Sequence, residues 1–137
     1  MKLALERDDN DEVMQALMAG MKAFNGAAVP GLTSHKIVAA IRDDAGTVVG
    51  GVIGRLAADS VYMEVVYTAD SVRGTGWGSK ALLLAEEEAK RLGATESWLY
   101  TMSFQAKPFY EKLGYHQFAE LKWKNGEHRR QFMRKDL

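Results

Sequence analysis

The order of hydrophobic and polar positions along the chain alternates between helical and strand-like periods. Residues 2–7 fit a short strand, and Asp9 with Glu12 forms the pattern of a capping box that opens a helix. The apolar residues of that helix recur at helical spacing, which predicts that they are buried: Val13, Leu17, Met21 and Phe24. Residues 26–34, which contain Pro30-Gly31, are the longest irregular stretch.

Three strand-like runs follow, at residues 35–42, 47–56 and 61–68, with turn signals at 43–46 and 57–60. Because the connections are short, we expect these strands to form an antiparallel meander.

The second half of the chain begins with an amphipathic helix over residues 77–92, which Gly93 ends. Its apolar residues share one face: Leu82, Ala85, Ala89 and Leu92. Its charged residues are expected on the opposite face: Glu86, Glu87, Lys90 and Arg91. A buried strand is expected at residues 95–101.

Pro108 suits the first turn of a further helix, and Gly114 suits its C-terminal cap. Asn125-Gly126 is expected to form the two-residue turn of a final hairpin. The alternation of helices and strands predicts one α/β domain over residues 1–137, long enough to bury roughly two-thirds of its unfolded surface.

Glu64 departs from the simple pattern of its strand. The odd positions of the strand are apolar and are expected to pack against a helix: Val61, Met63, Val65 and Tyr67. Glu64 then lies mid-strand on the opposite face, where a carboxylate costs desolvation free energy unless it is paired or functional. Two interpretations stay open, a functional carboxylate and an ion pair with Arg or Lys on a neighbouring strand.

A glycine-rich segment, Arg73-Gly74-Thr75-Gly76-Trp77-Gly78-Ser79, joins this strand to the helix that follows. Glycines let backbone N–H groups approach an anion, and the helix dipole adds positive potential, so the segment indicates a phosphate site. The spacing does not fit a P-loop, because Gly74 and Gly78 are too close and Ser79-Lys80 is in the reversed order. It also differs from the dinucleotide pattern G-x-G-x-x-G.

A second motif narrows the choice of cofactor. Residues 106–115 read Ala-Lys-Pro-Phe-Tyr-Glu-Lys-Leu-Gly-Tyr, about thirty residues after the R-x-x-G-x-G that begins at Arg73. In this order and spacing, the two segments resemble the signature segments of the GNAT superfamily of N-acetyltransferases. The resemblance is continuous from about Val48 to the C-terminus. It implies an α+β, three-layer fold with a mixed, mostly antiparallel sheet of six to seven strands, flanked by helices and splayed at its central strands.

The resemblance also implies an acetyl-CoA-dependent transfer of an acetyl group to an amine, by direct attack in a ternary complex. In related enzymes the first segment binds the pyrophosphate and the splayed strand pairs with the pantetheine arm. The cofactor-binding residues would be Val66, Tyr67, Thr68, Arg73, Gly74, Thr75, Gly76, Trp77, Gly78, Ser79 and Ser103. Ser103 stands where many members carry Asn, and Trp77 would either cover the cofactor or pack under the helix.

Two residues match the catalytic positions that the resemblance implies. Glu64 would be the base, directly or through water, because deprotonating an amine of pKa near 10.4 at neutral pH costs roughly 4 kcal/mol. Tyr110 would protonate the departing thiolate, since a phenol stays protonated at neutral pH. The alternative for Tyr110 is a core aromatic. A triad of Ser79, His116 and Asp70 has no spacing that favours it.

Composition limits the other functions. Lys plus Arg and Asp plus Glu number 18 each, so no global field favours nucleic acid or a membrane surface. The absence of cysteine excludes disulfides and thiolate metal sites, and the three scattered histidines do not suggest a metal. Without an N-terminal apolar segment, a cytoplasmic location is expected.

The acceptor is the least defined part of the hypothesis. Its expected walls are residues 26–34, Tyr62 and the final hairpin with Trp123, His128 and Arg129. The basic cluster Lys122, Lys124, Arg129 and Arg130 indicates either an acidic acceptor or an ordinary solvated hairpin. A small-molecule amine is the leading hypothesis, and a homodimer is left open. The alternative is a non-catalytic module that binds CoA or acyl-CoA as a sensor or partner.

Overall fold

The computed structural model describes residues 1–5 and 11–137, which divide into two compact units, residues 1–32 and 33–137. The first unit holds one helix, α1 (Asp11–Ala28). Leu17, Met21 and Phe24 of this helix are exposed rather than buried as predicted. The helix also takes in residues 26–28 of the stretch predicted to be irregular.

The strand predicted at residues 2–7 is not found over residues 2–5, which form no regular element, and its remainder lies outside the described residues. Asp9 of the predicted capping box lies outside them as well. The prediction of one domain over residues 1–137 stays a prediction. Of the helices in the described part of the chain, none is both long and apolar enough to cross a membrane.

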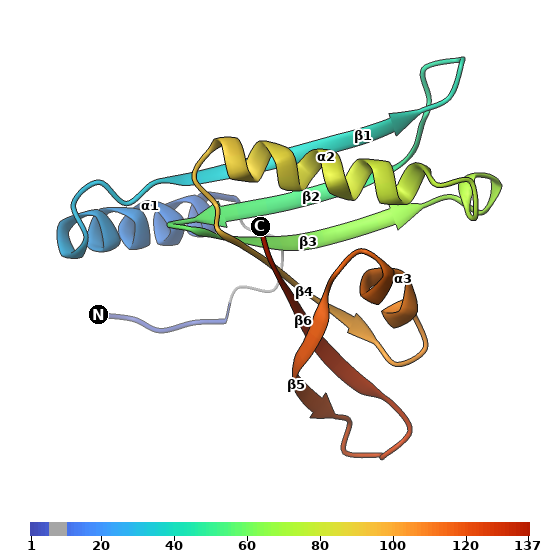
Figure 1. Ribbon diagram of the computed structural model, residues 1–137. Helices are drawn as coiled ribbons and strands as arrows, with labels where there is room; N and C mark the ends of the chain where they lie inside the picture. The colour runs from blue at the N-terminus through green and yellow to red at the C-terminus, as the bar shows by residue number, and fades with distance from the viewer. Residues whose placement is uncertain (6–10) are drawn as a thin grey trace. The chain divides into compact units, whose positions relative to one another are not determined.

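The second unit is built on a mixed sheet of six strands (Figure 1). The strands are β1 (Ser34–Arg42), β2 (Val48–Ala57), β3 (Ser60–Thr68), β4 (Glu96–Met102), β5 (His116–Lys122) and β6 (Arg129–Asp136), in the order β1-β2-β3-β4-β6-β5. Only β3 and β4 run parallel. This architecture confirms the predicted mixed, mostly antiparallel sheet and the meander of its first three strands.

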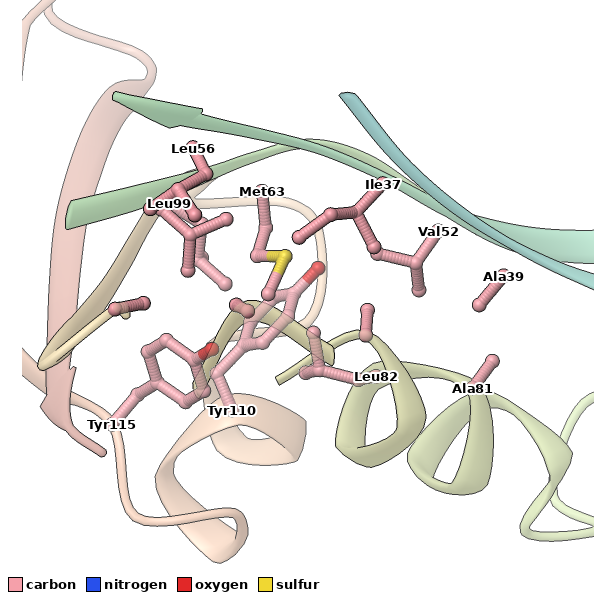
Figure 2. Packing of buried hydrophobic residues seen from close by; sticks show 14 of the residues in the cluster. Ile37, Ala39, Val52, Leu56, Met63, Ala81, Leu82, Leu99, Tyr110 and Tyr115 are labelled. Atoms are coloured by element: carbon pink, nitrogen blue, oxygen red, sulfur yellow. The ribbon is translucent and has the colours of Figure 1, made fainter. Parts of the chain in front are cut away.

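The helix α2 (Trp77–Arg91) packs on β1, β2 and β3, and the short helix α3 (Lys107–Lys112) follows β4. Figure 2 shows the core between these helices and the sheet, with Met63, Leu82 and Leu99 beside the rings of Tyr110 and Tyr115. Small residues on α2, Ala81, Ala85 and Ala89, let the helix approach the sheet closely.

The central strands separate after a short parallel pairing. β3 and β4 pair only at Ser60 with Glu96, Val61 with Ser97 and Tyr62 with Trp98, although β3 continues to Thr68 and β4 to Met102. The strand ends therefore carry unpaired backbone groups along the opening. This is the splay that the resemblance implied.

A β-bulge at Glu64 changes the orientation of the second half of β3. Ile53 of β2 pairs with Val65, whereas the next residue, Gly54, pairs with Met63, so Glu64 is the extra residue. Val61 and Met63 are buried, but Val65 and Tyr67 are exposed, against the predicted alternation. After the bulge the residues that face α2 are Val66 and Thr68.

Glu86 was predicted on the polar face of α2, but it is 4% exposed. Its carboxylate accepts hydrogen bonds from the Tyr115 hydroxyl at 2.7 Å and from the Lys135 ammonium at 2.6 Å. The Tyr115 hydroxyl also lies 2.6 Å from the hydroxyl of the buried Ser97. Residues distant in sequence thus satisfy a charge on the core side of the helix.

The final hairpin also differs from the prediction. β5 and β6 are joined by residues 123–128 rather than by two residues. The Gly126 N–H donates to the Trp123 carbonyl at 2.9 Å, which places Gly126 last in a four-residue turn with φ of 77°. The rings of Phe104, Trp123 and His128 contact one another edge to face and account for the longer loop.

Candidate active site

A cavity of about 670 Å³ occupies the opening between β3 and β4. Its walls are the end of β3, the loop that leads into α2, and the segment from the end of β4 into α3. Of the predicted cofactor-binding residues, the ones that line it are Val66, Tyr67, Thr68, Arg73, Gly74, Gly76, Gly78 and Ser79. Tyr110 lines it as well. Its volume lies within the usual range for small-molecule sites.

The glycine-rich loop presents unused backbone donors to this cavity. Within the described residues, no acceptor is found for the N–H groups of Gly74, Gly76, Trp77, Gly78 or Ser79. Gly74 and Gly76 have φ of 76° and 84°, in the left-handed region that favours glycine, and a Cβ on either would meet open space. Donors of this kind at the start of a fifteen-residue helix form an anion site.

Gly78 has a different role from the other two glycines. A Cβ at this position would lie 3.3 Å from the Thr68 methyl group and 3.8 Å from the Phe109 ring. The missing side chain therefore lets the first turn of α2 pack closely on both the end of β3 and α3.

Arg73, Thr75 and Trp77 are held in ways that the sequence did not indicate. The Arg73 guanidinium pairs with the exposed Asp70 carboxylate at 2.7 Å. The Thr75 hydroxyl donates to the Val72 carbonyl at 2.5 Å, and Thr75 does not line the cavity. Trp77 is half exposed and lies under the Lys80 ammonium, 4.4 Å from the ring centroid, so it neither packs under the helix nor lines the cavity.

The segment that joins β4 to α3 forms the opposite wall. The Gln105 side chain accepts a hydrogen bond from the Met102 N–H at 2.8 Å, and the Thr101 hydroxyl accepts one from Ala106 at 3.4 Å. These bonds hold the segment that carries most of the wall residues not predicted from the sequence: Thr101, Phe104, Gln105, Ala106 and Phe109, with Val72 on the side of the glycine-rich loop. Ala106 and Phe109 belong to the second motif, and Val72 precedes the first.

Ser103 does not line the cavity. Its N–H donates to the Arg129 carbonyl at 2.9 Å, and its hydroxyl accepts from the Arg129 N–H at 3.2 Å. Ser103 therefore extends the pairing of β4 with β6.

Tyr110 joins the cavity to the core. It is 7% exposed, its ring packs edge to face on Phe109 and Tyr115, and burial raises the pKa of its phenol. Among the described residues, none hydrogen-bonds its hydroxyl. Because the neutral phenol keeps its proton over a wide pH range, Tyr110 can serve as a proton donor at the cavity wall.

Glu64 lies two residues before Val66 and does not line the cavity. Its carboxylate accepts a hydrogen bond from the Arg55 Nε–H on β2, and this interaction raises the pKa of Arg55. The ion pair with a neighbouring strand, one of the two interpretations of Glu64 drawn from the sequence, is therefore present. Both side chains remain partly exposed, so the carboxylate keeps access to solvent.

Aromatic side chains continue this face of the sheet beyond Glu64. Tyr62 stacks on Trp98 with ring centroids 4.3 Å apart and on Tyr100 at 6.2 Å. Burial, a hydrogen bond to Tyr100 and the negative charge of Glu64 raise the pKa of Tyr62 to about 12. Within the described residues, no group of three His, Asp or Glu side chains is placed to hold a metal ion.

Comparison with known proteins assigns the fold and the motifs. Residues 9–115 match the Acetyltransferase (GNAT) family. Acetyltransferase Atu2258 of Agrobacterium fabrum is 29% identical over 110 residues, 80% of either chain. Blasticidin-S acetyltransferase of Streptomyces morookaense is 30% identical over 77 residues, 56% of this chain and 57% of that protein. A crystal structure from Agrobacterium tumefaciens, assigned as an acetyltransferase, has a TM-score of 0.88 at 26% identity, covering all of both chains.

Solved structures of the same fold include complexes with coenzyme A and with acetyl coenzyme A. The cavity and the glycine-rich loop of this chain fit such a ligand, because they combine an extended opening with free main-chain donors at one end. Since the family match spans well over half of the sequence, the chain is an acetyl-CoA-dependent acyltransferase that belongs to the GNAT acetyltransferase family.

Proposed function

We propose that the chain acetylates a primary amine of a small molecule, by direct attack of the amine on acetyl-CoA in a ternary complex. The observation that carries the proposal is the single cavity that runs from the free N–H groups of the glycine-rich loop to the Tyr110 ring. A diphosphate bound at one end would direct a thioester toward the other.

The donor is held mainly by backbone in this proposal. The N–H groups of Gly74 and of residues 76–79 would bind the pyrophosphate, with Arg73 leaving its exposed ion pair with Asp70 to join them. The free edge of β3 at residues 66–68 would pair with the amide groups of the pantetheine arm. Because Thr75, Trp77 and Ser103 do not line the cavity, we assign their side chains no contact with the donor.

Glu64 is the proposed base. It lies on β3 two residues past Tyr62, the last residue that pairs with β4, and is partly exposed. The ammonium of an acceptor would lose one proton to this carboxylate, directly or through water, and the amine would then attack the thioester carbonyl. Arg55 holds the carboxylate in place as a positioning residue.

Tyr110 is the proposed acid. As the new C–N bond forms and the C–S bond breaks, the nitrogen would lose its second proton to solvent, and the Tyr110 hydroxyl would donate a proton to the leaving sulfur and regain one from solvent. The net reaction converts ammonium and thioester into amide, thiol and one proton. Because the amine attacks the thioester directly, the proposal needs no acetylated enzyme, and the absence of cysteine excludes an acetyl-cysteine intermediate.

A small-molecule acceptor is supported by the relative that acetylates, by its name, blasticidin S. The test combines two measurements on the purified chain. Calorimetric titration measures the affinity for acetyl-CoA, and a thiol-release assay over a panel of amines measures acceptor-stimulated turnover. We expect micromolar binding and saturable release with at least one primary amine.

Initial rates at several concentrations of both substrates test the direct mechanism. We expect intersecting lines in double-reciprocal plots and no acetylated protein by mass spectrometry after mixing with acetyl-CoA alone. Parallel lines with an acetylated intermediate would contradict direct transfer. Tight binding without release by any amine or peptide would contradict the proposed reaction.

A further inference from the structure

Arg130 is the arginine of β6 that pairs with no carboxylate among residues 1–5 and 11–137. The strand carries three arginines; Arg129 pairs with Glu120 at 3.6 Å and Arg134 with Glu96 at 2.6 Å. No carboxylate in the described part of the chain pairs with Arg130, and its Nε is buried without a hydrogen-bond acceptor. Because Nε itself is closed to solvent, a ligand would accept hydrogen bonds from the terminal Nη groups, which carry a charge that no described carboxylate neutralises.

The guanidinium of Arg130 lies on the aromatic face beside the proposed base. It is stacked over the Tyr100 ring, 4.5 Å from the centroid, and Tyr100 in turn stacks with Tyr62. The charges of Arg130 and Glu64 both act on the Tyr62 phenol, the first lowering its pKa and the second raising it. One positive and one negative group therefore act on the same aromatic ring, at the point where β3 and β4 separate.

We propose that the acceptor is an amine that also carries a carboxylate, which Arg130 binds while the amine faces Glu64. This inference rests on the proposed function. A carboxylate matches the planar guanidinium fork, and stacking on Tyr100 fixes the orientation of that fork. A phosphate dianion fits less well, because its second negative charge calls for a second cation. Arg55, which also lies beside Glu64, is already paired with that carboxylate.

The aromatic rings define the remainder of the acceptor site. Tyr62 and Tyr100, the latter 39% exposed, offer aromatic ring edges between the two charges, since their faces are stacked against Trp98, against each other and against Arg130. They suit the carbon chain of an aminocarboxylate better than a strongly hydrated polyol or polyamine. We therefore expect amino acids with apolar or aromatic side chains to be preferred among aminocarboxylates.

The test uses pairs of acceptors that differ only in the carboxylate: phenylalanine with phenethylamine, methionine with 3-(methylthio)propylamine, and β-alanine with ethylamine. For each pair, the ratio of kcat/KM values is measured in the wild type and in Arg130→Gln. We expect the ratio to fall by about 10-fold to 100-fold in Arg130→Gln, the usual effect of losing one charge-assisted hydrogen bond. Comparing ratios removes differences in intrinsic amine reactivity.

Arg134→Gln is the matched control, since it removes an arginine from the same face of the same strand, and it should leave the ratio unchanged. An equal ratio in the wild type and Arg130→Gln, with amines still acetylated, would overturn this inference and leave the proposed function standing. If no amine is acetylated, the proposed function fails. Titration of phenylalanine into CoA-loaded protein then still decides the role of Arg130, because binding should occur in the wild type and be lost in Arg130→Gln.

Discussion

The Arg55 guanidinium and the Glu64 carboxylate pair across β2 and β3, with Glu64 in a β-bulge. The bulge places an extra residue at the point where β3 leaves β4, and it reverses the faces of the residues that follow. The Glu64 carboxylate is both the ion-pair partner of Arg55 and the proposed base. Removing Glu64 should abolish both roles, whereas removing Arg55 should abolish only the ion pair.

We expect Glu64→Gln to lower kcat/KM for the acceptor by about 10²-fold to 10⁴-fold, because a positioned base is lost. Residual activity should rise with pH as the free amine becomes more abundant, so the pH–rate profile should shift upward. Acetyl-CoA affinity, measured by calorimetry, should stay within a factor of about two.

Arg55→Gln is the control for the ion pair. It removes the same salt bridge and leaves the carboxylate, so the rate should fall by less than about 10-fold if Glu64 is a base, since exposed pairs contribute little. Equal losses in the two variants would assign Glu64 a purely structural role.

Tyr110→Phe tests the proposed acid with little structural disturbance. Because no described residue hydrogen-bonds the hydroxyl, the change should leave Tm nearly unaltered. We expect kcat to fall by about 10²-fold while the Kd for acetyl-CoA is retained. A kcat of Tyr110→Phe equal to that of the wild type would mean that Tyr110 is a core aromatic and not the acid.

The role of the glycine-rich loop is tested by Gly76→Ala beside Gly46→Ala. Gly76 and Gly46 have nearly the same φ, 84° and 83°, with open space where a Cβ would lie, so both variants should lose about 1 to 2 kcal/mol of stability. Only Gly76→Ala should also raise the Kd for acetyl-CoA, because Gly46 lies in the remote β1–β2 turn. Equal Kd values in the two variants would contradict an anion site at this loop.

The sequence predicted those features whose signal is local. The glycine-rich loop, the caps at Pro108 and Gly114 and the first four strands of the sheet each depend on neighbouring residues, and they are found where expected. The two motifs also located most of the cavity wall, since they lie at its two ends.

Features that depend on distant residues were not predictable in the same way. A period-two pattern contains no marker for a bulge, so Val65 and Tyr67 were assigned to the wrong face. Glu86 follows the charged pattern of α2, but its partners, Tyr115 and Lys135, come from later elements. The pairing of Arg129 with Glu120 and of Arg134 with Glu96, which leaves Arg130 without a carboxylate among the described residues, likewise follows from the way the strands assemble.

The buried Glu86 carboxylate should make Lys135 important for stability. Lys135→Met leaves that carboxylate without its cation, and we expect the free energy of unfolding at pH 7 to fall by about 3 kcal/mol. The double variant Glu86→Gln with Lys135→Met should lose less than the sum of the two single changes, because the unpaired charge is gone. Urea unfolding of all four proteins measures this coupling, and additive losses would contradict a direct interaction.

The tyrosines of the second unit should make the fold sensitive to alkali. Burial raises the folded-state pKa of Tyr62 to about 12 and that of Tyr115 also rises, whereas an unfolded tyrosine titrates near 10. The unfolded chain therefore releases these protons first, so their stabilising contribution is complete below pH 10 and is lost as pH rises from 10 toward 12. Urea unfolding at pH 8, 10 and 11 should show this loss. Tyr62→Phe should show a shallower decline above pH 10, because one titrating group is gone, and an unchanged slope would mean that Tyr62 ionises as readily in the folded protein as in the unfolded chain.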